Sequence, residues 1–558
     1  MTNFYEIAPG PLPKIGPEDA GNKAWNLMRM AAAGLRVPAG FVIPASWPKQ
    51  FNAEAAREAA LTETLSGGIA RLEKLTGLGF GSSRKPLLVS VRSGSAISMP
   101  GMMETVLDVG LNPDSVEGII RFTGNPRLAW DCYRRLIQGY AEVVQRLPAA
   151  PLDELVEEAV SAAGVASDRD LDFRTLRQLT RAMTNRFHDL AGEAFPLDPH
   201  EQLRKAVAAV FRSWDAEKAV AFRQLHGIDD SVGTAVTVQT MVFGNAGGES
   251  GSGVAFTRNP ATGDGELYLD FRFNGQGEDV VAGRRRTEDH ERLRHTLPNV
   301  WRQIESVAQT LEALFHDSQD FEFTLQNGVL YLLQSRDAKR SDWAALRIAV
   351  DLVREGLIEP CEALRRLRRI DLTAVSRTHF ETRSAPLLAS AQAASIGVTS
   401  GEVALDSESA ERMAQEGATV ILVRRETATS DIKGIASATG ILTASGSRTS
   451  HAAVVARQLG KVCVVGCANL EVDLSKRRCK IGGQILNEGD YLSLDGNEGR
   501  VYSGKLDVVT ERPEQELRMI EQWTRGSMAA LRHFGDAPAL TVGKIGGAGG
   551  DCERMLFG

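Results

Sequence analysis

The sequence predicts a protein of several domains that mixes α-helices and β-strands, an α+β multidomain fold class. Its length of 558 residues is enough for two to four domains with ample cores. Segments such as 151–164 and 175–192 repeat apolar residues with the 3.6-residue period of an amphipathic helix. Elsewhere, short apolar runs alternate with glycine-rich turns, which is the pattern of strands joined by tight loops.

Composition excludes several classes of protein. A net charge of -7 argues against nucleic-acid binding, and a hydrophobic content of 43% is ordinary for a soluble globular protein. No apolar run reaches the length of a membrane span and the N-terminus has no signal-peptide core, so we expect a cytoplasmic protein without a membrane partner. Six scattered cysteines without a CxxC pair predict reduced, mostly buried thiols.

Two segments of the N-terminal half combine small residues with fixed charge. Residues 21–43 predict a Gly-led turn, an amphipathic helix that includes Lys23, and a strand. Residues 87–112 predict a buried strand that runs into a loop rich in Gly, Ser and Met. Small residues let backbone amides approach phosphate groups closely, and Arg92 adds a positive charge.

Residues 235–263 repeat this pattern as strand, Gly-rich loop, strand and turn. Each Gly-rich loop alone is weak evidence for phosphate binding, because hairpins and tight turns use the same residues. Between the two Gly-rich parts, residues 114–225 are predicted to be mostly helical and to form an insertion.

Residues 319–336 predict a β-hairpin whose register decides which side chains share a face. A two-residue loop, Asn327–Gly328, would mix polar and apolar residues on both faces. A three-residue loop, 326–328 with Gly328 left-handed, instead pairs Asp320 with Gln334, and we predict this second arrangement. One face then collects Asp320, Glu322, Gln334 and Arg336, and the other collects Phe321, Phe323, Leu325, Val329, Tyr331 and Leu333.

The polar face of this hairpin has two interpretations. Asp320 and Glu322 are suited to hold Mg²⁺ against a polyphosphate, because hard cations prefer oxygen ligands. Gln334 and Arg336 would then contact phosphate oxygens. The alternative is a solvent-exposed face with a cross-strand ion pair, which is common in antiparallel sheets.

The strongest functional signal is a strand–loop–helix–strand segment around His451. Strands are predicted at Gly440–Thr443 and Val462–Val465, with a polar Gly/Ser loop and an Ala/Val-rich helix between them. A helix start offers unpaired N–H groups and partial positive charge, and imidazole can carry a transferred group. Thr449 or Ser450 would cap the helix. The alternative is a capped helix with a merely polar, exposed histidine.

This segment closely resembles the phosphohistidine motif of the enzymes that make or use phosphoenolpyruvate, and most of all the pyruvate phosphate dikinase family. The family's loop usually reads GGMTSHAAVVAR, and this chain reads GSRTSHAAVVAR, with Ser447 and Arg448 as the departures. The segment SVRSGSAISMPGMM in the N-terminal half also resembles the corresponding sequence of the dikinase that uses inorganic phosphate. The resemblance implies an ATP-grasp nucleotide-binding domain with a helical insertion, followed by a swivelling β/β/α phosphohistidine domain.

The resemblance also implies roles for single residues. His451 matches the catalytic histidine, and Asp320 and Glu322 match the metal-binding carboxylates. Thr449 matches a regulatory phosphorylation site of some family members, although we favour its role as a cap. Residues that match nucleotide or phosphate contacts are Lys23, Arg92, Gln239, Met241, Gly251, Ser252, Gly253, Gln334 and Arg336.

Domain boundaries follow from these placements. We expect a nucleotide-binding domain over 1–340, a helical linker over 341–383, the phosphohistidine domain over 384–508 and a helical tail over 509–558. The family's pyruvate-binding (β/α)₈ barrel needs roughly 250 residues, far more than follow residue 508. The barrel is therefore expected to be a separate subunit.

The expected activity is that of a phosphotransferase of the dikinase type. ATP and Mg²⁺ bind, His451 takes the β-phosphate of ATP, and inorganic phosphate takes the γ-phosphate, so that AMP and pyrophosphate form. The phosphoryl group then passes to pyruvate on the separate barrel. Two alternatives stay open: a self-contained phosphotransferase with another small-molecule or protein acceptor, and a non-catalytic nucleotide-binding remnant.

Overall fold

In the computed structural model the chain forms two compact units, each assembled from separate stretches of sequence. The first unit comprises Met1–Ser252, Phe273–Gln276 and Phe321–Arg336, and the second comprises Gly253–Arg272, Gly277–Asp320 and Asp337–Gly558. Both units combine helices with sheets, as the sequence predicted. The structure describes all residues except 1–2, 52, 98, 100–102, 166, 278–287, 382–384, 428–430, 447–450 and 536–558, and describes only the backbone of 288–290, 451, 454, 458 and 526–535.

The first unit contains a five-stranded antiparallel sheet with the order β1-β2-β7-β5-β6. The apolar runs that predicted strands are buried here, since every residue of β2 and the first five residues of β7 are buried. The strands are β1 (Tyr5–Ile7), β2 (Gly40–Ile43), β5 (Val89–Gly94), β6 (Thr105–Val109) and β7 (Ala235–Thr240), and a separate short parallel pair is formed by β3 (Gly79–Phe80) and β4 (Pro86–Leu87).

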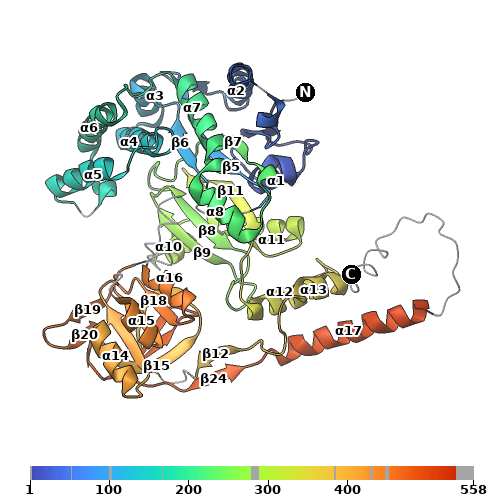
Figure 1. Cartoon of the computed structure of the whole chain (residues 1–558), viewed down its shortest axis with the longest axis vertical. Coiled ribbons are helices and arrows are strands. Elements are labelled where there is room, and N and C mark those ends of the chain that lie inside the picture. The colour runs from blue at the N-terminus through green and yellow to red at the C-terminus, as the bar shows by residue number, and fades with distance from the viewer. Residues whose placement is uncertain are drawn as a thin grey trace. The chain divides into compact units, whose positions relative to one another are not determined.

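Helices pack against this sheet and against one another (Figure 1). Their ends follow from local capping: Asn112 and Asp172 accept N–H groups at the starts of α3 and α6, and Gly124 and Gly192 end the same helices in the left-handed conformation. The helices are α1 (Pro17–Ala32), α2 (Glu54–Thr76), α3 (Pro113–Thr123), α4 (Pro126–Val143), α5 (Ala150–Ala163), α6 (Phe173–Ala191), α7 (Pro199–Arg212) and α8 (Glu217–His226).

A second sheet has four strands in the order β11-β10-β8-β9. Two helices, α10 (Glu288–Thr296) and α11 (Pro298–Phe315), precede its hairpin in the sequence. The strands are β8 (Gly251–Phe256), β9 (Tyr268–Phe273), β10 (Gln319–Gln326) and β11 (Val329–Asp337).

The hairpin β10–β11 is present, but the predicted three-residue turn was wrong. β10 ends at Gln326 and β11 begins at Val329, which leaves a two-residue loop of Asn327 and Gly328. These loop residues have φ values of 49° and 77°. Two consecutive positive φ angles are typical of a type I′ turn, whose backbone twist matches the right-handed twist of the flanking strands.

The predicted apolar face of β11 was wrong for the same reason. Leu330 and Leu332 are buried, whereas Val329, Tyr331 and Leu333 are half-buried. On β10, the predicted core side chains Phe321, Phe323 and Leu325 are fully buried, as expected. The shorter loop places Phe321, not Asp320, opposite Gln334. The prediction that Gln334 and Arg336 share a strand face with Asp320 and Glu322 was therefore wrong, because a one-residue change in register exchanges the two faces of a strand.

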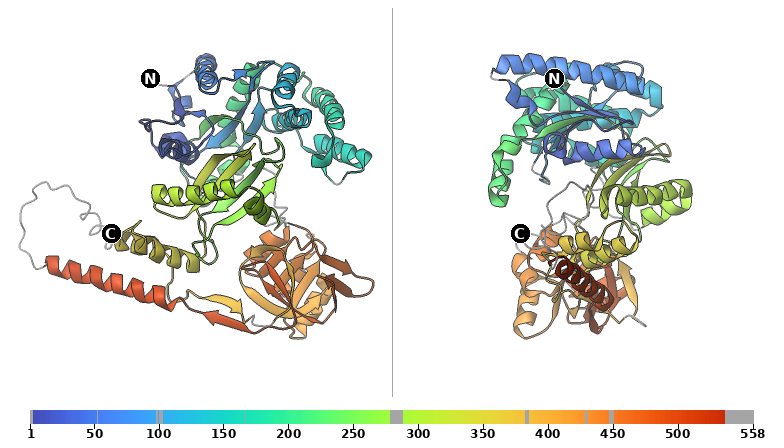
Figure 2. Two further views of the ribbon diagram at one scale, coloured as in Figure 1. Left: turned by 180° about the vertical axis from the view of Figure 1, so that it is seen from behind. Right: turned by 90° about the vertical axis from the view of Figure 1, so that its right-hand side faces the viewer.

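Helices α12 (Asp342–Arg354), α13 (Pro360–Leu367) and α17 (Glu514–Gly535) lie side by side in the second unit (Figure 2). Their apolar side chains form a shared cluster. Next to them, β12 (Arg377–Phe380) and β24 (Val508–Glu511) form an antiparallel ribbon. These strands flank the residues between 381 and 507, so both chain connections to that region run side by side.

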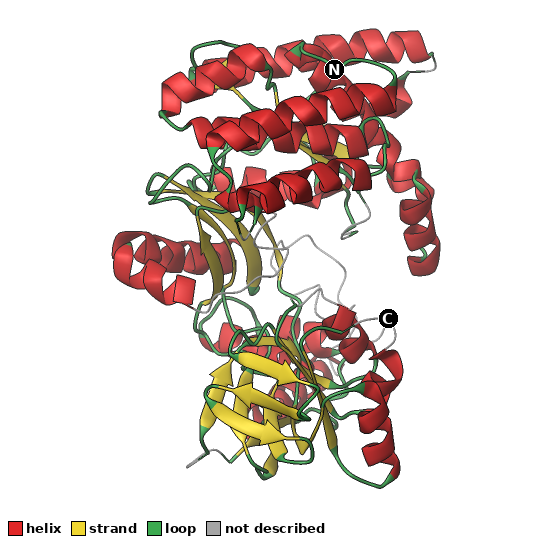
Figure 3. Cartoon of the chain, turned by 90° about the vertical axis from the view of Figure 1, so that its left-hand side faces the viewer, coloured by secondary structure: helices red, strands yellow, loops and turns green. Residues whose placement is uncertain are grey.

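The region between these two strands contains an eight-stranded sheet with the order β13-β23-β22-β15-β16-β17-β18-β14 (Figure 3). Its middle strands β15 to β18 run parallel. The strands are β13 (Leu387–Ser390), β14 (Gln392–Ser395), β15 (Val398–Ala404), β16 (Val420–Arg424), β17 (Gly440–Thr443), β18 (Val462–Val465), β22 (Tyr491–Asp495) and β23 (Arg500–Ser503).

Alternating residues of these parallel strands belong to two different cores. On β16, Val420 and Leu422 pack with the helices, whereas Ile421 and Val423 pack on the other face with a small three-stranded sheet. This region therefore has three layers: the small sheet, the eight-stranded sheet and the helices. The small sheet comprises β19 (Leu470–Asp473), β20 (Arg478–Ile481) and β21 (Gln484–Asn487), and the helices are α14 (Ser407–Gln415), α15 (Ile432–Ser437) and α16 (His451–Gln458).

Two predictions from composition can be compared with the described residues. The described cysteines are all free, and four of the five are buried, as predicted. Burial raises the pKa of Cys463 to about 12, which keeps its thiol protonated and unreactive. Among the described helices, none is both long and apolar enough to span a lipid bilayer.

The aromatic cluster of the helical region yields a stability prediction. Phe187 on α6 is fully buried and makes edge-on ring contacts with Phe195. Phe187→Ala is expected to lower the free energy of unfolding by about 3 kcal/mol, because a large cavity would remain. Leu190→Ala, on the same helix but exposed, serves as the control and should change it by less than about 0.5 kcal/mol. Urea denaturation followed by circular dichroism measures both, and equal effects would contradict the packing described.

Candidate functional site

An unusually close backbone contact between α1 and β5 sets the position of Lys23. Helix α1 is interrupted at Gly21, whose φ of 74° favours glycine. A side chain at this position would also lie 2.5 Å from the carbonyl oxygen of Gly94, at the end of β5. Asn22 fixes the contact, since its backbone N–H donates to Ser95 O (3.1 Å). Lys23 therefore lies in the first turn of the continuing helix, where the helix dipole also favours anions.

Three predicted site residues, Arg92, Glu322 and Arg336, lie around Lys23. Arg92 Nη2 lies 3.7 Å from Glu322 Oε2, and both side chains are partly buried. Burial, followed by the charge of Arg92, lowers the pKa of Lys23 to about 8; the charge of Glu322 opposes this shift, and Arg336 adds to it. Strands β5, β10 and β11 and helix α1 thus bring three cations and one carboxylate together, an arrangement that favours a polyanionic ligand.

The predicted metal ligands Asp320 and Glu322 lie two residues apart on β10. Asp320 is almost fully buried, whereas the side chain of Glu322 keeps 28% of its exposure. Glu322 within the cation cluster and a second carboxylate two residues away on the same strand form a donor set that fits Mg²⁺. Within the described residues, no group of three or more His, Cys, Asp or Glu side chains could hold a metal ion.

Other predicted contact residues have packing roles of their own. The side-chain amide of Gln239 donates to Pro38 O (2.9 Å) and is buried within the five-stranded sheet. Met241 follows β7, is partly buried against the main core, and donates its backbone N–H to Leu88 O. Gln334 on β11 is also buried. Gln239 and Met241 thus lie at the end of β7, and Gln334 lies on β11 two residues before Arg336.

The predicted Gly-rich segment forms the start of β8. Gly251, Ser252 and Gly253 are all buried, and the Ser252 hydroxyl lies 3.0 Å from the Thr324 hydroxyl of β10. Any contact of this segment with a ligand would therefore use its backbone.

His451 is the first residue of α16, which follows β17 in the parallel part of the eight-stranded sheet. Its side chain, and the whole of Ser447, Arg448, Thr449 and Ser450, lie outside the described parts of the structure.

The stem of the loop before His451 is held by backbone bonds at the carboxyl ends of the strands. Ala444 and Ser445 donate to Arg424 O and Arg425 O, and Cys467 donates to Thr443 O. The carboxyl ends of parallel strands are the usual location of ligand sites in such sheets.

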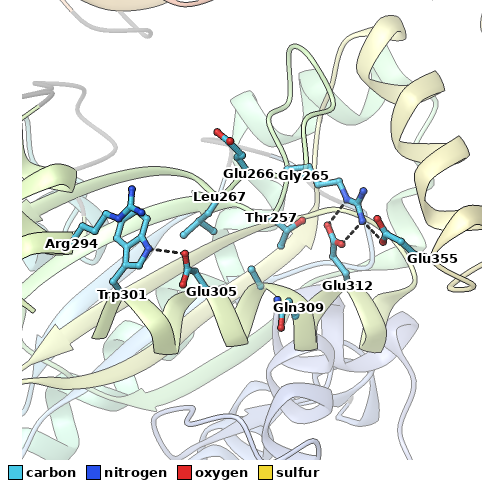
Figure 4. Close-up of a pocket in the computed structure, with 12 residues that line it drawn as sticks. Thr257, Gly265, Glu266, Leu267, Arg294, Trp301, Glu305, Gln309, Glu312 and Glu355 are labelled. Atoms are coloured by element: carbon cyan, nitrogen blue, oxygen red, sulfur yellow. Dashed lines mark hydrogen bonds and ion pairs between the residues drawn. The ribbon is translucent and has the colours of Figure 1, made fainter. Parts of the chain in front are cut away.

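A hollow with a volume of about 860 Å³ lies elsewhere, within the second unit beside α11 (Figure 4). Glu305 accepts a hydrogen bond from the indole of Trp301 (2.7 Å), and Glu312 and Glu355 both bind the buried guanidinium of Arg258. With four glutamates against two arginines, this hollow is a poor site for a polyphosphate. None of the predicted site residues lines it.

Sequence reasoning missed a polar network next to the Gly-rich loop. Asp131 of α4, Asn245 and Gln276 are all buried and hydrogen-bonded in series. No motif marks them, because Asp131 lies within an ordinary helical period and the other two lie in loops. Only their burial reveals them, since buried polar groups need partners.

The pKa of Lys23 predicts a pH dependence of anion binding. Lys23 is protonated below about pH 8, and only the protonated form attracts phosphate. Raising the pH from 7 to 9 should therefore weaken tripolyphosphate binding by about tenfold relative to the Lys23→Gln variant. Titration calorimetry of both proteins at several pH values measures this, and the variant corrects for titration of the ligand. Parallel pH profiles of the two proteins would contradict the assignment.

Comparison with known protein families adds independent information. The family described as "Pyruvate phosphate dikinase, AMP/ATP-binding domain" matches residues 55–303. The family described as "PEP-utilising enzyme, mobile domain" matches residues 417–499, which include His451. The two families therefore match, respectively, a region that contains Arg92, Gln239 and the Gly-rich segment, and the region that contains the predicted catalytic histidine.

Sequence similarity to individual proteins extends over most of the chain. Pyruvate, phosphate dikinase of Clostridium symbiosum is 40% identical over 96% of this chain and 63% of its own length. Pyruvate, phosphate dikinase 2 of Oryza sativa subsp. japonica is 39% identical over 96% of this chain and 61% of its own length. The chain thus spans about six tenths of the length of these relatives. It is similar to the pyruvate, phosphate dikinases, which are transferases of phosphorus-containing groups, and two of its regions match the families of their AMP/ATP-binding domain and of the mobile domain.

Proposed function

We propose that this chain performs the nucleotide half-reaction of a dikinase-type phosphotransferase. The first region, of ATP-grasp type, binds ATP; His451 takes the β-phosphoryl group; and inorganic phosphate takes the γ-phosphoryl group, which yields AMP and pyrophosphate. The observation that carries the proposal is the cluster of Lys23, Arg92, Glu322 and Arg336. It brings three positive charges and one carboxylate together from four separate elements, as binding of a nucleotide polyphosphate with Mg²⁺ would require.

The cluster accounts for the chemistry that a protein can contribute to phosphoryl transfer. Lys23, Arg92 and Arg336 offset the negative charge that spreads over the phosphoryl oxygens. Asp320 and Glu322 would hold Mg²⁺, which would offset part of the negative charge on the phosphoryl groups. The burial of Lys23 strengthens its attraction to phosphate, because a partly desolvated charge is less screened by water.

His451 supplies the nucleophile in this proposal. Its place at the start of α16, at the carboxyl end of a parallel strand, supports a role in carrying an anion, since backbone N–H groups and the helix dipole are available there. Thr449 is proposed to cap this helix.

The phosphoryl group then has to leave the site where it was loaded. A rigid-body swing of residues 384–508 about the linker 341–383 would carry it to an acceptor. The ribbon of β12 and β24 supports a motion in which both connections move as one element.

Pyruvate is the proposed acceptor, bound by a barrel outside this sequence, as expected above. The names of the homologues support pyruvate as a substrate class of such proteins. A different acceptor would leave the half-reaction at His451 unchanged, so that half-reaction is the part to test first.

Transfer of labelled phosphate tests the proposal directly. The full chain is incubated with Mg²⁺ and ATP labelled at the β or at the γ position, with and without inorganic phosphate. Acid-labile protein label is expected from the β position only, and it should vanish in His451→Ala. The control His188→Ala, an exposed histidine on α6, should keep the label. Label from the γ position alone, or no label under any condition, would overturn the proposal.

The carboxylate of Glu322 yields a second prediction. Glu322→Gln keeps the shape of the side chain but removes the charge that faces Mg²⁺ and Arg92. The rate of His451 labelling should fall by about a hundredfold or more, and higher Mg²⁺ concentrations should recover part of it. Glu305→Gln, on α11, is the matched control and should label at the normal rate. Unchanged labelling in Glu322→Gln would exclude its role as a metal ligand.

A further inference from the structure

We infer that Asp131, Asn245 and Gln276 form a buried positioning device for the Gly-rich loop between β7 and β8. The inference rests on the proposed function, because it connects the geometry of this loop with ATP binding. The loop runs from Met241 to Ser250 and leads directly into Gly251–Gly253. Any contact that fixes the loop therefore also fixes the backbone amides expected to approach the phosphates.

Asp131 is the anchor of the network. It is 3% exposed and accepts hydrogen bonds from Arg134 Nη2 (2.8 Å), Arg135 Nε (3.2 Å) and Asn245 Nδ2 (3.3 Å). Burial alone would raise the pKa of Asp131, but the neighbouring guanidinium groups of Arg135 and Arg134 hold it below its ordinary value. The side chain is therefore a carboxylate at neutral pH. It ties helix α4 to the loop through a charge-assisted bond.

Asn245 also connects the loop to the chain that follows β9. Its side-chain oxygen accepts a hydrogen bond from Gln276 Nε2 (3.0 Å), and both residues are almost fully buried. The neighbouring Gly244 packs so closely that a Cβ would lie 2.1 Å from Gly275 O and 2.4 Å from Ser252 Oγ. The loop, the chain after β9 and the start of β8 are thus locked together at this point.

The turn of the β10–β11 hairpin holds the loop from the other side. Phe243 donates its backbone N–H to Gln326 Oε1 (2.8 Å), and Gly328 donates to Glu249 O (2.9 Å). Asn327 donates its backbone N–H to Ser250 Oγ (3.0 Å). The two-residue turn that sequence reasoning missed is therefore part of the same anchoring system.

Between these anchors, the tip of the loop is open. A Cβ at Gly247 or Gly248 would meet no atom within 4 Å. The ends of the loop are fixed by buried polar contacts while the tip stays free of packing. A satisfied polar network specifies one geometry more strictly than apolar packing does, because each lost bond leaves a buried group without a partner. The three residues are positioning residues, which act through the loop.

Asn245→Leu in the full chain tests the inference, since it keeps the volume and removes both hydrogen bonds. The Kd for ATP by calorimetry and the KM for ATP in His451 labelling should rise about tenfold. The kcat should change less than about twofold, and amides of residues 241–250 should exchange hydrogen faster. Gln138→Leu is the control, because Gln138 also lies on α4 but bonds the exposed Asp153 (2.7 Å). It should change none of these quantities.

If Asn245→Leu does not fold, Gln276→Leu leaves the Asp131 contact intact and should still raise the KM for ATP. Unchanged Kd and KM in a folded variant would overturn the positioning role, as would a proportional loss of kcat and thermal stability.

ATP binding and His451 labelling of the unaltered protein distinguish failure of this inference from failure of the proposed function. If it binds ATP but does not label His451, the proposed function fails, and the Kd and exchange data still decide the role of the network. If it binds no ATP, both fail. Normal binding and labelling with no response to Asn245→Leu overturns the inference alone.

Discussion

The contact between Gly21 and Gly94 is the constraint on which the candidate phosphate site depends. It requires a positive φ and no side chain at Gly21, because a Cβ there would lie 2.5 Å from Gly94 O, and it lets a helix continue against the end of a strand. Lys23 is then held beside Arg92 although both carry positive charge. The lowered pKa of Lys23 reflects this crowding and the burial that accompanies it. A site that concentrates cations in this way is prepared for an anion before the anion arrives.

The Gly-rich loop between β7 and β8 is likewise held by several separate elements. Backbone and side-chain bonds from α4, from the chain after β9 and from the hairpin turn meet at this loop, and Met241, Phe243 and Ala246 of the loop also pack against the apolar core. Loops that bind ligands are often the least stable parts of a fold. Buried polar anchors reconcile this with a fixed geometry, because they stabilise the ends of the loop without filling its tip.

Much of the architecture could be predicted from the sequence. The helical period of residues 175–192 became α6, and the strands and helix around His451 lie close to the predicted boundaries. These features are local, since they depend on side-chain periodicity and capping within a few residues. The hairpin turn could not be predicted in the same way. Segregation of charged residues favoured a longer loop, whereas the twist of the strands favours the two-residue turn at Asn327 and Gly328.

The sequence by itself determined the residue types of the site: a lysine after a glycine, an arginine on a buried strand, two carboxylates on one strand and a histidine at a helix start. The tertiary structure alone decided which of them meet. Lys23, Arg92, Glu322 and Arg336 come from distant segments, and only the packing of α1 against the two sheets brings them together. It also revealed Asp131, Asn245 and Gln276, because burial, which turns an ordinary polar residue into one that must have a partner, is a property of the folded chain.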